Sequence, residues 1–175
     1  MLLEMFEKHR VRYALIGGWA LASVGYVRAT QDIDFLLHHE DYPRVKAALD
    51  GFGYALLHES EDAANFVGKM GELGQVDFLM AHRPYALRML ERAMRKPVLG
   101  GKFHIPVLRT EDLIGLKLQS LVNDEERYHN DLQDIEALIA LDPQAIHWGI
   151  IKEYCQLLDK NHEYESLCRK FLDAH

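Results

Sequence analysis

The stretch VRYALIGG at residues 11–18, followed by DIDFLL at residues 32–37, decides how this chain folds. The first stretch is short and apolar and closes on a double glycine, which predicts a buried strand that ends in a turn. The residues after the glycines repeat apolar side chains at helical spacing up to Gly25, so we expect a helix that begins directly on the turn. The second stretch predicts a strand with Asp32 and Asp34 on one face and its apolar residues in the core.

Two neighbouring acids on one strand face are the first sign of chemistry. Carboxylates this close repel each other unless a cation or a proton lies between them, and oxygen-only ligands suit Mg²⁺ better than zinc. Asp32 and Asp34 are therefore candidate metal ligands; the alternative is a solvated strand face that carries two acids by chance. The turn at Gly17 and Gly18 offers free backbone N–H groups at a helix start, which favours a phosphate. A third acid, Asp77, projects from another predicted strand and strengthens the metal hypothesis.

The remaining chain divides by its periodicity. Between the acids and residue 108 the sequence predicts helices over 42–49 and 84–94 and strands over 53–58, 63–70, 75–80, 97–99 and 103–108. From Thr110 onward only helical periodicity remains. We therefore expect an α+β fold: a mixed sheet flanked by helices in residues 1–108, followed by a C-terminal helical bundle in residues 109–175 that packs on it.

Composition sets limits on function. The chain has 175 residues, 49% of them apolar and 27% charged, which predicts one compact globular protein. Its net charge of −7 argues against binding nucleic acid by bulk counterion release, although it leaves a local basic patch open. Cys155 and Cys168 form no CxxC pair and are expected to be reduced, buried thiols. No run of about 18 apolar residues occurs, so we expect a cytoplasmic protein without a membrane segment.

The helical half carries two charges on its apolar side. On a helical wheel, Lys117 falls among Leu113, Ile114 and Leu121, and Asp131 falls on the apolar side of the next helix. Because an unpaired buried charge is costly, these two residues either pair as a structural bridge or line a polar cleft.

The spacing of the glycines and acids matches a known pattern. The order Ile16-Gly17-Gly18, thirteen residues, Asp32-Ile33-Asp34 and then Asp77 resembles the signature of the nucleotidyltransferase superfamily, whose fold is shared with DNA polymerase β. The local sequence from Gly17 to Asp32, with Arg28 and Thr30, is similar to that of small lincosamide and aminoglycoside nucleotidyltransferases. It is also similar to the nucleotidyltransferase toxins of bacterial toxin–antitoxin systems.

The resemblance implies site residues and ligands. Asp32, Asp34 and Asp77 would hold two Mg²⁺ ions, and Asp77 would also take the acceptor's proton. In the toxin-type members a lysine and an aspartate of the helical part face the nucleotide, which favours the cleft alternative and leaves open whether Asp131 or Asp134 is the counterpart. The residues implied to bind the nucleoside triphosphate are Gly17, Gly18, Arg28, Thr30, Lys117 and Asp131.

The implied activity is transfer of a nucleoside monophosphate from a triphosphate to a hydroxyl group, with release of pyrophosphate. A small antibiotic, tRNA or a protein are the candidate acceptors, and an antitoxin or a second copy of the chain is a candidate partner. Two alternatives remain. One is a catalytically silent interaction module of a toxin–antitoxin pair; the other is a metal-dependent phosphohydrolase that consumes the triphosphate without labelling an acceptor.

Overall fold

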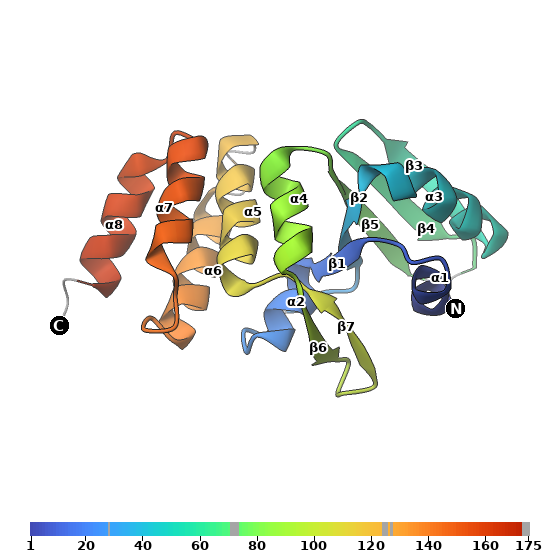
Figure 1. Ribbon diagram of the computed structural model, residues 1–175, viewed down its shortest axis with the longest axis horizontal. Coiled ribbons are helices and arrows are strands. Elements are labelled where there is room, and N and C mark those ends of the chain that lie inside the picture. Colours follow the sequence, from blue (N-terminus) through green and yellow to red (C-terminus); the bar gives the residue numbers. More distant parts are fainter. Residues whose placement is uncertain (28, 71–73, 124–125, 127, 173–175) are drawn as a thin grey trace. The chain divides into compact units, whose positions relative to one another are not determined.

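The computed structural model describes residues 1–27, 29–70, 74–123, 126 and 128–172 (Figure 1). The strands are β1 (Tyr13–Ile16), β2 (Ile33–His38), β3 (Tyr54–Glu59), β4 (Ala63–Gly68), β5 (Gln75–Ala81), β6 (Met94–Val98) and β7 (Phe103–Val107). The helices are α1 (Leu2–Lys8), α2 (Gly17–Ser23), α3 (Tyr42–Gly51), α4 (Pro84–Arg92), α5 (Thr110–Asn123), α6 (Tyr128–Leu141), α7 (Trp148–Leu157) and α8 (Asn161–Phe171), with a 3₁₀ turn η1 (His39–Asp41).

All seven strands form one mixed sheet in the order β3-β4-β5-β2-β1-β7-β6. β2 runs parallel to β5, and β1 runs parallel to β7. The other neighbours are antiparallel. The sheet, its helices and the helical segments after residue 109 confirm the predicted α+β class.

One face of the sheet is built around aromatic residues. Phe6 of α1 is fully buried, and its ring centroid lies 4.5 Å from that of Tyr13 and 5.5 Å from that of Phe35. Phe78 stacks beside Phe35 at 5.8 Å. Because strand side chains alternate, this packing commits every second residue of β1, β2 and β5 to the core and turns the residues between them to the opposite face. Asp34 and Asp77 are among the residues on that opposite face.

Several predicted boundaries differ from the structure. The strand expected over 97–99 spans Met94–Val98 as β6. The strand expected from Asp32 begins one residue later, at Ile33, so Asp32 lies in the bend that leads into β2. The helix expected over 84–94 ends at Arg92, because Ala93 is extended and β6 begins at Met94.

The chain separates into two compact units. Unit 1 comprises residues 1–23 and 27–109, and unit 2 comprises residues 24–26 and 110–175. In unit 2, α5 and α7 meet at Gly115, where an added Cβ would lie 2.7 Å from the Tyr154 ring. The Tyr154 hydroxyl donates to the buried Asp112 carboxylate at 2.6 Å. In the described part of the chain, no helix is both long and apolar enough to cross a membrane.

Candidate active site

Asp34 and Asp77 are register partners on adjacent parallel strands. Ile33 pairs with Val76 and Phe35 with Phe78, so the apolar neighbours of the two acids share the opposite face of the sheet. Val76, Phe35 and Phe78 are buried there, and Ile33 is half-buried. Since neighbouring strands lie about 4.8 Å apart, the two carboxylates project side by side from one face of the sheet. The structure therefore brings together two of the three predicted acids.

The glycine turn lies directly against these residues. Gly17 follows the end of β1, has φ +63°, and comes so close to Asp34 that a Cβ on Gly17 would lie 2.0 Å from the Asp34 Oδ2 atom. A Cβ on Gly18 would lie 2.6 Å from the Cβ of Thr30. Because Gly17 and Gly18 lack a Cβ atom, the side chains of Asp34 and Thr30 can pack directly against the turn. Phosphate binding by the turn's N–H groups stays a prediction.

Asp32 is placed by a local hydrogen bond. The Thr30 hydroxyl donates to the Asp32 carbonyl oxygen at 3.3 Å, and the Asp32 side chain is half-buried before β2. In the described part of the chain, no group of three or more His, Cys, Asp or Glu side chains is arranged to hold a metal ion. The metal role of the three acids therefore stays a prediction. Arg28 lies outside the described residues.

Two polar neighbours of Asp77 were not singled out from the sequence. The Gln75 side-chain amide donates to both Asp77 carboxylate oxygens, at 3.0 and 3.1 Å. Asn65 of β4 is the register partner of Asp77 on its other side. Gln75 stands two residues before Asp77 and shares its strand face, so the period-2 pattern could have found it. Asn65 becomes visible only once β4 and β5 are paired.

The charged residues of the helical half form a cluster inside unit 2. Lys117 Nζ lies 2.6 Å from Asp131 Oδ1 and 2.7 Å from Asp134 Oδ2, and the two carboxylates are 1% and 4% exposed. The Tyr26 hydroxyl donates to Asp134 at 3.1 Å. The predicted inward orientation is confirmed, and one lysine pairs with both aspartates that the sequence left as alternatives. Their role toward a nucleotide stays a prediction.

Comparison with known proteins identifies the family of this chain. The sequence model of a family described as "uncharacterised nucleotidyltransferase" matches residues 1–169, almost the whole chain. The chain belongs to this nucleotidyltransferase family. No curated protein matches the sequence. Membership makes nucleotidyl transfer the class of activity of the chain.

Solved structures agree with the fold of this nucleotidyltransferase. The chain is similar to the lincomycin-bound lincosamide antibiotic adenylyltransferase LnuA, with 18% identity, a TM-score of 0.51 and coverage of 78% of this chain and 93% of that one. It is similar to ANT(2″)-Ia in complex with adenylyl-2″-tobramycin, with 16% identity, a TM-score of 0.53 and coverage of 98% and 93%. A nucleotidyltransferase-like protein from Paracoccidioides brasiliensis gives 17% identity, a TM-score of 0.55 and coverage of 98% and 93%.

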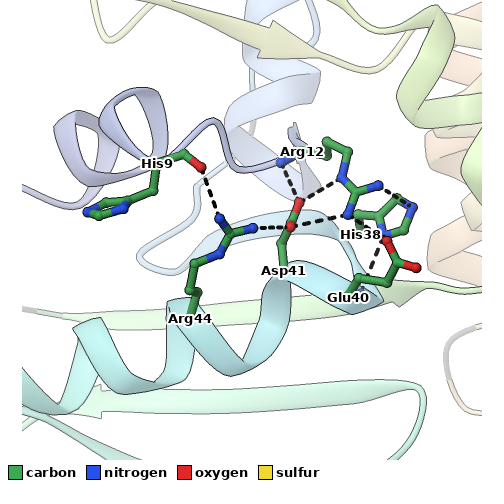
Figure 2. Close-up of polar contacts among 6 residues, drawn as sticks. All are labelled: His9, Arg12, His38, Glu40, Asp41 and Arg44. Atoms are coloured by element: carbon green, nitrogen blue, oxygen red, sulfur yellow. Dashed lines mark hydrogen bonds and ion pairs between the residues drawn. The ribbon is translucent and has the colours of Figure 1, made fainter.

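A second charge cluster in the nucleotidyltransferase lies at the other end of β2 from Asp34. Figure 2 shows Asp41 between two arginines. The Arg12 backbone N–H and Nε donate to Asp41 Oδ2 at 2.9 and 2.8 Å, and Arg44 pairs with Asp41 Oδ1. The His38 Nε2 atom lies 3.0 Å from Arg12 Nη1. This cluster ties the entry of β1 to the start of α3, which is a structural role.

The Asp41 cluster predicts a stability effect at acid pH. Burial by itself raises the pKa of Asp41, but hydrogen bonds from Arg12 and Arg44 outweigh it and lower that pKa to about 2. A carboxyl whose pKa falls on folding stabilises the protein above the unfolded pKa, near 4, and that contribution disappears as the pH drops toward 2. Because both arginines are half-exposed, we expect about 1–2 kcal/mol from this residue.

Asp41→Asn should therefore lower Tm by about 5 °C at pH 7 and leave Tm almost unchanged relative to wild type near pH 2. Calorimetric melting between these pH values measures both effects. Asp50→Asn is the control, because this substitution removes the same charge from a side chain that is 81% exposed. Equal acid sensitivity in wild type and Asp41→Asn would contradict the assignment.

Proposed function

We propose that this nucleotidyltransferase transfers a nucleoside monophosphate from a nucleoside triphosphate to an acceptor hydroxyl in a Mg²⁺-dependent reaction. The observation that carries the proposal is the pairing of Asp34 with Asp77 on one sheet face, directly beside Gly17. Two carboxylates held side by side repel each other, and a bound divalent cation removes that repulsion. A site built this way is suited to chemistry on a triphosphate.

The donor set of the site fits Mg²⁺. Asp34 and Asp77, which the sheet register places side by side, offer only carboxylate oxygens, the hard ligands that this ion prefers, and Asp32 is predicted to add a third carboxylate. When bound, two Mg²⁺ ions would supply positive charge at the α-phosphate and lower the pKa of an acceptor hydroxyl. The Gln75 amide already holds the Asp77 carboxylate by both oxygens, so that carboxylate has a defined orientation before any ligand binds.

The proposed reaction is a single displacement. The acceptor oxygen forms a bond to the α-phosphorus atom, the bond from that atom to the bridging oxygen breaks, and pyrophosphate leaves with the bonding electrons. The acceptor's proton passes to the Asp77 carboxylate. The N–H groups of Gly17 and Gly18 would donate to the β- and γ-phosphates. Arg28, Thr30, Lys117 and Asp131 remain the other predicted nucleotide contacts.

One experiment tests the proposal. The purified protein is incubated with each α-labelled nucleoside triphosphate, Mg²⁺ and a cell extract, and the labelled products are separated by size and charge. We expect one class of molecule to become labelled, with equal release of pyrophosphate and with complete loss of both on addition of EDTA. Triphosphate consumption without a labelled product would identify a phosphohydrolase and contradict the proposal, as would no reaction with any triphosphate.

A further inference from the structure

We propose that the part of the sheet face next to Asp77, on β3, β4 and β5, binds the acceptor, and that this acceptor is a small hydroxylated molecule that is uncharged or cationic. We call this part of the sheet the acceptor face. It consists of the outward residues Ala55, His58, Ala63, Asn65, Val67, Gln75 and Leu79. The inference rests on the proposed function, because it assigns the acceptor's place in that reaction.

The register of the strands aligns four polar residues across the sheet. Asp34 pairs with Asp77, Asp77 with Asn65, and Asn65 with His58. These four side chains therefore form one polar row across β2, β5, β4 and β3. With strands about 4.8 Å apart, His58 lies about 10 Å from Asp77, which is the span of one or two sugar-sized rings. A molecule with a hydroxyl at Asp77 thus reaches Asn65 and His58.

This part of the face is accessible to solvent: His58 and Leu79 are exposed, and the other five residues are half-buried. On β2, Leu36 follows Asp34 on the same face and is only 1% exposed, and α4 packs against β2 and β5. On β5 the corresponding residue, Leu79, is 40% exposed. Ala63, which pairs with Leu79, adds almost no bulk. The face therefore combines exposed apolar surface with a few polar groups, which is the usual make-up of a small-molecule site.

The charge of the acceptor face limits the kind of acceptor that it can bind. The seven outward residues of the acceptor face include no lysine or arginine. A polynucleotide acceptor needs cationic side chains along its phosphates, and the chain as a whole carries −7. These charges favour an uncharged or cationic acceptor over tRNA.

Hydrogen-bonding capacity assigns the contacts. Asn65 offers both a donor and an acceptor, and the exposed His58 ring does the same, so both suit hydroxyl groups of a bound molecule. In the reaction, the hydroxyl at Asp77 loses its proton to that carboxylate while its oxygen joins the α-phosphorus and pyrophosphate leaves. Asn65 and His58 would hold the remainder of the acceptor and determine which hydroxyl is presented.

The test compares acceptors and variants. The full chain is incubated with labelled triphosphate, Mg²⁺ and one of three probes: tobramycin, lincomycin or total tRNA, with the small-molecule fraction of a cell extract as a fourth arm. We expect labelling in a small-molecule arm and none in tRNA. For the labelled acceptor, Asn65→Ala and His58→Ala should each raise KM at least about tenfold and leave KM for the triphosphate unchanged, since a lost hydrogen bond weakens binding without changing the reacting atoms.

Two further variants make the test specific. Leu79→Lys places a positive charge on an exposed position of the acceptor face and should raise KM for a cationic acceptor without unfolding the protein. His104→Ala removes an exposed histidine of β7, outside the face, and should behave as wild type. Labelling of tRNA, or an unchanged acceptor KM in Asn65→Ala, His58→Ala and Leu79→Lys, would overturn this inference alone. No labelling with any acceptor and triphosphate would overturn the proposed function together with it.

Discussion

Asp34→Asn is expected to reduce nucleotidyl transfer by at least about 10³-fold while the protein stays folded. The amide has the same shape as the carboxylate, so it still fits against the Gly17 backbone, where nothing larger is accommodated. It removes the negative charge that would hold the cation, and a metal ion's stabilisation of the transition state is worth several kcal/mol, or about a thousandfold in rate. The measurement is the rate of label transfer at saturating triphosphate.

A second measurement distinguishes loss of ligand binding from loss of folding. Mg²⁺ with a non-hydrolysable triphosphate analogue should raise Tm of the wild type, because a ligand that binds only the folded state stabilises it. Asp34→Asn should show little or no shift. Asp50→Asn removes the same charge from an exposed position paired with Lys69 and should keep full activity and the full shift. An Asp34→Asn variant with more than a tenth of the wild-type rate would refute the role of Asp34.

The strands that carry the acids could be predicted because they are encoded locally. β1, β2 and β5 are short apolar runs closed by glycine or polar residues, and their alternating pattern places Asp34 and Asp77 opposite the core. The helical wheel likewise predicted that Lys117 and Asp131 face inward, since only one side of each helix is apolar. These features depend on residues close together in sequence.

What the sequence did not predict depends on pairing between distant strands. The row from Asp34 to His58 requires the register of four strands, and β3 is interrupted by an irregularity between Leu56 and His58 that no local pattern marks. The close contact between Gly17 and Asp34 could also not be predicted from the sequence. The double glycine predicted free N–H groups for a phosphate, and that stays a prediction. The structure adds that the missing Cβ of Gly17 leaves space for the Asp34 carboxylate.

Gly17→Ala is expected to lower both activity and stability, which makes it the strongest test of the turn. Alanine at φ +63° costs about 1 kcal/mol of backbone strain, and its methyl group would lie 2.0 Å from Asp34 Oδ2. The Asp34 side chain must therefore shift from its position on the sheet face. We expect a loss of about 2–3 kcal/mol in the free energy of unfolding and a loss of transfer of at least about 10²-fold.

The control isolates the contact with Asp34 from the backbone strain. Gly100 has φ +68° and no atom within 4 Å of an added Cβ, so Gly100→Ala carries the same strain without the clash. It should cost about 1 kcal/mol in unfolding free energy and leave the transfer rate unchanged, because it lies in the β6–β7 turn. Chemical denaturation and label transfer measure the two quantities. Displacing the Asp34 carboxylate should disrupt the site. If Gly17→Ala matched Gly100→Ala in both stability and transfer rate, the close approach of Gly17 to Asp34 would therefore have no role in catalysis.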